Sequence, residues 1–186
     1  MMRALVSYVG ILLLSACTNG SSGSSSTIYF TDYERYSAST AVYAARNNKM
    51  PLVVYGNPTS ADQPTLNAAV ARGLAGTHVA PAVAFSPVAT QDAPTYRTVV
   101  VFGGTTRDII CSAKPITTSA NGDGPMSAAF CLDSEPLSFA SGALQRLDGA
   151  NDPKLQTHMA SVGYALFPIA NPNHADDCGP GRVSCK

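Results

Sequence analysis

The division of the first 26 residues into an apolar segment and a polar one most constrains how this chain can fold. Residues 4–14 are almost entirely apolar and follow a single positive charge at Arg3. This segment has the length of a secretory signal and is far shorter than the ~20 residues that a spanning helix requires. Residues 18–26 contain only Thr, Asn, Gly and Ser, a composition typical of a flexible tether. We therefore expect the folded domain to begin near Thr27.

Four residues at the junction carry a resemblance to a known class of protein. The segment Leu14-Ser15-Ala16-Cys17 resembles the lipobox of bacterial lipoproteins, in which a leucine and two small residues precede an invariant cysteine. The resemblance implies that residues 1–16 are a signal peptide and that residues 17–26 form a lipidated tether. The Cys17 thiol would carry diacylglycerol, and the new amino group would carry a further chain such as palmitate. The alternative is an ordinary signal peptide, or an uncleaved anchor, with an incidental cysteine.

The same resemblance implies a location. Two or three acyl chains exceed what stable membrane attachment requires, at ~0.8 kcal/mol for each buried CH₂ group. In many Gram-negative bacteria an aspartate directly after the lipidated cysteine retains a lipoprotein at the inner membrane, and this chain has Thr18 there. We therefore expect a lipid anchor in the outer membrane, on its periplasmic face. Exposure on the cell surface stays open as an alternative.

The remaining cysteines indicate an oxidised domain. Without Cys17 the chain has four, and an even number in an exported protein is typical of disulfides, with three connectivities open. We favour Cys178–Cys185, because residues 179–184 can fold back as a small loop, and therefore Cys111–Cys131. A metal site formed by Cys178, Cys185 and His174 is the alternative, but the paired CxxC spacing of zinc modules is missing. We predict no metal and no cofactor.

The order of predicted elements indicates an α+β fold. We expect one mainly antiparallel sheet of four or five strands, with three or four helices largely on one face. Residues 27–168 would form a single periplasmic domain, and residues 169–186 an irregular tail tied by a disulfide. Strands are predicted at 27–30, 51–56, 79–88, 96–103, 108–114 and 126–132, and helices at 33–47, 60–74, 137–147 and 153–166. Residues 89–94 are predicted to be the loop of a hairpin between 79–88 and 96–103, and the unbroken apolar run 99–102 is expected in the centre of the sheet. Ser60 and Gln63 have the spacing of a capping box at the start of the second helix, and Asp152 and Pro153 mark the start of the last one. The helix at 137–147 is indicated only by apolar residues at helical spacing.

Candidate catalytic groups are scattered. The chain lacks a Gly-x-Ser-x-Gly elbow and a Ser-x-x-Lys pair. We interpret the three histidines, His78, His158 and His174, as surface or capping residues rather than as bases or ligands. Gly103-Gly104 follows a predicted strand but lacks the lysine and the spacing of a phosphate-binding loop. A tight connection between strands is the better interpretation.

Charge and aromatic content suggest binding to another envelope component. Twelve basic residues balance twelve acidic ones, which gives no electrostatic reason to expect nucleic acid as a partner. Tyrosines, Tyr43 among them, gather near the start of the domain, and Tyr29, Tyr33 and Tyr36 form the candidate contact surface. We therefore expect a non-catalytic binding or assembly module with an envelope protein or cell-wall partner. The alternative is a periplasmic hydrolase or small-ligand binder whose site is assembled from scattered residues.

Overall fold

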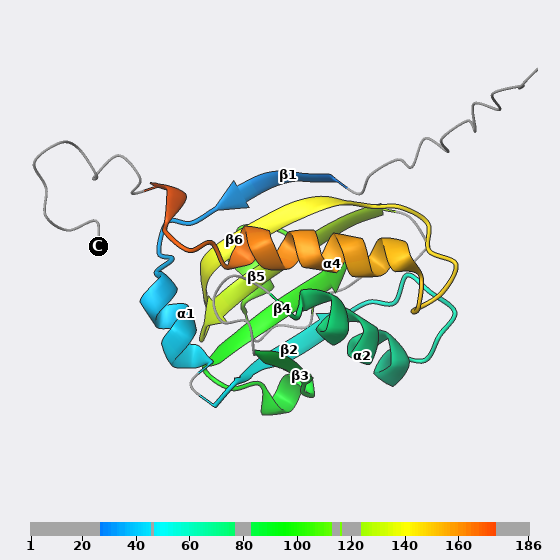
Figure 1. The fold of residues 1–186 in the computed structure, drawn as a ribbon, viewed down its shortest axis with the longest axis horizontal. Coiled ribbons are helices and arrows are strands. Elements are labelled where there is room, and N and C mark those ends of the chain that lie inside the picture. Colours follow the sequence, from blue (N-terminus) through cyan, green and yellow to red (C-terminus); the bar gives the residue numbers. More distant parts are fainter. Residues whose placement is uncertain (1–26, 46, 77–82, 113–115, 117–123, 174–186) are drawn as a thin grey trace, which may run out of the picture.

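A computed structural model describes residues 27–45, 47–76, 83–112, 116 and 124–173. Its six strands form one mixed sheet in the order β1-β6-β5-β4-β2-β3, covered by helices (Figure 1). The α+β class and the largely antiparallel pairing are confirmed, and the predicted sheet of four or five strands has six. The strands are β1 (Thr27–Asp32), β2 (Lys49–Tyr55), β3 (Ala84–Pro87), β4 (Tyr96–Phe102), β5 (Gly124–Leu132) and β6 (Glu135–Leu144); the helices are α1 (Ala38–Ala44), α2 (Gln63–Leu74), α3 (Arg107–Ile110) and α4 (Pro153–Leu166), with a 3₁₀ turn at Thr90–Asp92.

The core is organised around β4, as its unbroken apolar sequence predicts. Val99, Val100, Val101 and Phe102 are each at most 2% exposed. Because successive side chains point to opposite faces, Val100 and Phe102 enter the larger apolar cluster, which also contains buried residues of α1, α2 and α4. Val99 and Val101 enter a smaller cluster with Ile110 of α3. Three of the four helices in the described part of the chain therefore contribute to one side, as expected.

The sheet is parallel where a hairpin was predicted. Both β3 and β4 pair with β2, and both pairs are parallel, so the expected hairpin between residues 79–88 and 96–103 is wrong. β3 covers only Lys49–Leu52 of β2, whereas β4 covers Leu52–Tyr55. Pro87, at the end of β3, is therefore level with Thr98, two residues after the start of β4, and the short segment containing Thr90–Asp92 joins the two strands. Residues 77–82 lie outside the described part.

Two other predicted elements are wrong for physical reasons. Residues 137–147 are mostly strand β6, because a strand covered on both faces loses the alternation that distinguishes it from a helix. Residues 108–114 were predicted as a strand, but their described part is the helical turn α3 ending at Cys111. Gly103 and Gly104, with φ of 102° and 73°, turn the chain out of the sheet before it. Glycine adopts such angles without steric cost.

The two long helices are capped by aspartates. Asp152 accepts hydrogen bonds from the backbone N–H groups of Lys154 (2.8 Å) and Asp148 (2.9 Å), and Pro153 opens α4 as predicted. In α2 the cap is Asp62, which accepts from the N–H of Thr65 at 2.9 Å, so the predicted start at Ser60 is wrong. These hydrogen bonds lower the pKa of both carboxyl groups. The first helix is also shorter than the predicted 33–47, since Tyr33 and Tyr36 precede α1.

The long helices approach each other closely at Gly73. A Cβ atom added there would lie 2.5 Å from the Cβ of Met159, which is fully buried on α4. Real Cβ atoms do not approach so closely, so a larger residue would push α2 and α4 apart. Glycine at this position permits the contact between the two helices that cover the larger cluster.

We expect Gly73→Ala to lower the free energy of unfolding. Overpacking costs about 1–3 kcal/mol, which outweighs the gain of up to ~1 kcal/mol from alanine's better helix propensity. Gly124→Ala is the matched control, because a Cβ at Gly124 meets nothing within 4 Å. Urea denaturation of both variants measures the difference. Equal or higher stability of Gly73→Ala relative to Gly124→Ala would contradict the close contact.

Candidate binding site

A row of aromatic rings runs from the surface into the core at the start of β4. Tyr43 of α1 meets Tyr96 edge-to-face, with ring centroids 5.9 Å apart. Tyr96 stacks on Phe130 at 6.2 Å, and Phe130 contacts Phe167 at 5.3 Å. Tyr43 is 55% exposed, whereas Phe130 and Phe167 are buried. The buried rings fix the plane of Tyr96, so the outer part of the row is a rigid aromatic surface.

The outer end of the row borders an open hollow of about 560 Å³. It lies where α1 ends beside the starts of β2 and β4 (Figure 1). Among the described residues its lining is mainly apolar and carries one charge, the ammonium group of Lys49. We call it the tyrosine hollow; it is lined by Tyr43, Ala44, Asn47, Lys49, Pro51, Pro94, Thr95 and Tyr96.

The polar groups of the tyrosine hollow favour one kind of ligand. The two phenol groups, the Asn47 amide, the Thr95 hydroxyl and the Lys49 ammonium can all donate hydrogen bonds. The lining residues that the structure describes include no carboxylate. The hollow therefore suits a ligand with exposed carbonyl or other acceptor oxygens and apolar surface that packs on tyrosine. The volume lies within the ordinary range for ligand sites.

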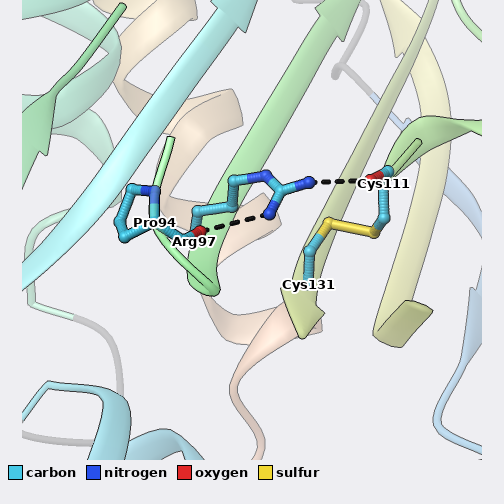
Figure 2. The surroundings of a disulfide bond; sticks show 4 residues. All are labelled: Pro94, Arg97, Cys111 and Cys131. Carbon is cyan, nitrogen blue, oxygen red and sulfur yellow. Dashed lines mark hydrogen bonds between the residues drawn. A yellow bond between two sulfur atoms is a disulfide. The ribbon is translucent and has the colours of Figure 1, made fainter. Parts of the chain in front are cut away.

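A second hollow of about 600 Å³ lies on the opposite face of β4. Figure 2 shows Arg97 beside the disulfide between Cys111 and Cys131, whose Cα atoms are 5.7 Å apart. Arg97 donates to the backbone carbonyls of Cys111 (2.7 Å) and Pro94 (3.1 Å). We call this the arginine hollow; its lining also includes Tyr55, Thr90, Gln91, Ala93, Ser112, Asp133 and Ser134.

The Cys111–Cys131 pair confirms one predicted disulfide. It joins the end of α3 to β5 and closes a loop of 20 residues in sequence separation. A loop of this length stabilises a fold by ~3 kcal/mol on the chain-entropy model. Only Cys131 lies in a strand, whereas Cys111 ends a helical turn. The predicted Cys178–Cys185 bond and the lipidation site Cys17 lie outside the described residues.

The predicted tyrosine surface is only partly exposed. Tyr29 is 63% exposed, but Tyr33 and Tyr36 are 8% and 3% exposed, so the contact surface predicted there is wrong for these two. The Tyr36 hydroxyl donates to the Pro168 carbonyl at 2.8 Å, and the Asn171 amide donates to the carbonyls of both tyrosines at 2.8 Å. Burial, and to a lesser extent the neighbouring Tyr33, raise the Tyr36 pKa. These tyrosines anchor the segment after α4.

The sequence indicated Tyr43 as one of several clustered tyrosines but did not connect it with Tyr96. The two are 53 positions apart, and only the folded sheet brings them together.

The Gly103-Gly104 segment leads into a single helical turn, α3, rather than directly into a strand. His78 and His174 lie outside the described residues.

His158 differs from its predicted surface or capping role. It is fully buried on α4, and neither ring nitrogen has a hydrogen-bond partner within the part of the chain that the structure describes. Burial lowers the pKa of the imidazole to about 4, because the charged form would lose its hydration. His158 is therefore neutral in the folded protein at neutral pH. It does not line the tyrosine hollow or the arginine hollow.

We expect His158 to make the folded protein less stable as the pH falls from about 6.5 to about 4. The unfolded chain binds a proton on this residue first, since its pKa there is near 6.5. The loss should reach about 3 kcal/mol, because one pKa unit corresponds to ~1.4 kcal/mol. The stabilising contribution is complete above pH 6.5.

The measurement compares the unfolding free energy of the natural chain and His158→Leu across this range. Leucine removes the titrating group without leaving a polar atom buried, so the difference between the two proteins should change with pH. A difference that stays constant between pH 4 and pH 6.5 would show that His158 does not titrate as described.

Among the described residues there is neither a candidate metal site nor a candidate membrane-spanning helix. No group of three or more potential metal ligands gathers among them. No helix among them is long and apolar enough to cross a bilayer. Known protein families, curated proteins and solved structures include no match to this chain.

Proposed function

We propose that this chain is a lipid-anchored envelope protein whose domain binds another envelope component without catalysing a reaction. The single observation that carries the binding role is the tyrosine hollow. Its exposed Tyr43 ring is supported through Tyr96 by the buried Phe130. A ligand can gain apolar contact there while the protein loses little side-chain freedom, since tyrosine has few rotatable bonds and the row is already fixed.

The proposed location rests on three separate features. The segment Leu14-Ser15-Ala16-Cys17 supports lipidation, and Thr18 supports the outer membrane. The disulfide between Cys111 and Cys131 supports an oxidising compartment, in which such bonds persist. The tether would hold the domain within a few nanometres of the bilayer, since nine flexible residues span roughly 15–18 Å. The partner would therefore be a protein or cell-wall component near that surface.

The groups with shifted pKa values have structural explanations. Asp62 and Asp152 cap helices, and Tyr36 donates to the Pro168 carbonyl. His158 is enclosed in the core away from both hollows. Catalytic groups are commonly found where such shifts coincide with a cleft. In the described residues the shifts and the hollows do not coincide, which favours binding over hydrolysis.

We expect Cys17→Ser to abolish incorporation of a tagged fatty acid in cells. Serine has no thiol for the diacylglycerol transfer that the lipobox implies, so the protein should also leave the membrane fraction or accumulate uncleaved. Thr18→Ser is the matched control and should be labelled normally. Persistent labelling of Cys17→Ser would exclude lipidation at this residue while leaving the binding role of the domain open.

The binding role is tested by photocrosslinking in intact cells. A photoreactive residue at Asn47 lies in the tyrosine hollow, and one at Tyr164, which is 47% exposed on α4, serves as the control position. We expect a discrete adduct from position 47 and none from position 164. Tyr43→Ser should reduce the yield from position 47 at least fivefold, because it removes the exposed ring. Equal yields with and without Tyr43 would contradict binding in this hollow.

A further inference from the structure

The arginine hollow holds a cation whose charge has no acidic partner. Arg97 donates to two backbone carbonyls, and no carboxylate of the described residues lies within 4.0 Å of it in an ion pair. By contrast, Arg107 pairs with Asp32 and Glu34, both at 2.9 Å. A guanidinium group has five N–H donors, so donors remain on Arg97 after these two bonds. The cation is therefore fixed in position without an ion-pair partner among the described residues.

The position of Arg97 is set by the fold. Arg97 of β4 lies directly opposite Cys131 of β5 in the sheet. Its side chain therefore lies on the same face as the disulfide (Figure 2). The disulfide holds the end of α3 there, and the carbonyl of Cys111 accepts one guanidinium N–H. The site would therefore be largely formed before a ligand arrives, which lowers the entropic cost of binding.

A second observation points to a ligand in the same hollow. The Ser112 hydroxyl oxygen is buried and has no hydrogen-bond partner within the described residues, although Ser112 lines the hollow. A buried polar group without a partner costs about 1–3 kcal/mol. Further donors in the lining are the hydroxyls of Tyr55, Thr90 and Ser134 and the amide of Gln91. An acceptor-rich ligand would satisfy these groups together with Arg97.

The shape of the cation, more than the charge of the lining, selects among anions. Asp133, the acidic residue among the described lining residues of the arginine hollow, is exposed at the turn between β5 and β6. Attraction to Arg97 and repulsion from Asp133 both double for a dianion, so these two charges together give a dianion little advantage over a monoanion. The remaining N–H donors of one guanidinium match the two oxygens of a single carboxylate. The described lining therefore suits one carboxylate.

We propose that the arginine hollow is a binding site for a monocarboxylate, either a small free acid or the carboxyl end of a peptide. Arg97 binds the carboxylate with its remaining N–H groups, and rotation of the Ser112 side chain toward the hollow would let its hydroxyl donate to the same ligand. This site is separate from the tyrosine hollow, because the two lie on opposite faces of β4. If no carboxylate bound in the arginine hollow, the proposed contact at Tyr43 would be unaffected.

The experiment uses the oxidised full chain in detergent micelles at constant ionic strength. Calorimetric and NMR titrations compare acetate, an N-acetylated tetrapeptide with a free carboxyl end, its amidated form, and inorganic phosphate. We expect the two carboxylates to bind and the amide not to bind. A tetrapeptide at least tenfold tighter than acetate identifies a chain end as the ligand, and equal affinities identify a small acid. Phosphate binding as tightly as the carboxylates, or no binding of either carboxylate, would overturn the proposal.

Two variants are expected to change the affinity for the carboxylate in opposite directions. Asp133→Asn should tighten carboxylate binding at least threefold, because it removes the opposing charge while asparagine tolerates the backbone φ of 51° found there. Arg97→Gln should weaken it at least tenfold. Lys49→Gln, which removes a cation from the other hollow, is the control and should leave the affinity unchanged. If Arg97→Gln does not fold, Asp133→Asn still decides, since unchanged or weaker binding would overturn the proposal.

Discussion

Burial of β4 on both faces is the constraint on which the rest of the structure depends. A strand whose residues Val99–Phe102 are almost fully enclosed needs neighbours on both edges and cover on both faces. β2 and β5 supply the edges, one parallel and one antiparallel. The long helices cover one face, with Gly73 allowing their close approach, and α3 with the disulfide covers the other. A small domain with sparse charge obtains a continuous core in this way.

The two hollows lie where this double cover ends. At the start of β4, the side chain of Tyr96 continues the larger cluster outward as a row of aromatic rings. The side chain of Arg97 lies on the opposite face of β4, where it lines the more polar arginine hollow. Adjacent residues of one strand therefore serve surfaces of different chemistry, because the pleat directs them to opposite sides. The buried core keeps both surfaces in fixed positions, which suits binding more than a role that requires movement.

Much of the fold follows from local sequence signals, but the assembly does not. Asp152 and Pro153 predict the start of α4, and the valines of β4 predict its central place. The sequence also pairs Cys111 with Cys131. Prediction from the sequence fails for β6, because burial on both faces removes the alternation of polar and apolar residues. It also fails for β3 beside β2, because strand pairing is not encoded locally. The candidate site was the least predictable part, because Tyr43 and Tyr96 meet only after the parallel strands assemble, while the clustered Tyr33 and Tyr36 are covered by the segment after α4.

Oxidative footprinting of tyrosines shows whether the tyrosine hollow is occupied in the envelope. The reactivity of each tyrosine is compared between the purified chain and the same chain in native envelope preparations. The account predicts that modification of Tyr43, 55% exposed in the isolated domain, falls at least fivefold in the envelope. Tyr164, 47% exposed on α4, should keep its reactivity. Unchanged reactivity of Tyr43, with protection at Tyr29 or Tyr164 instead, would contradict the account.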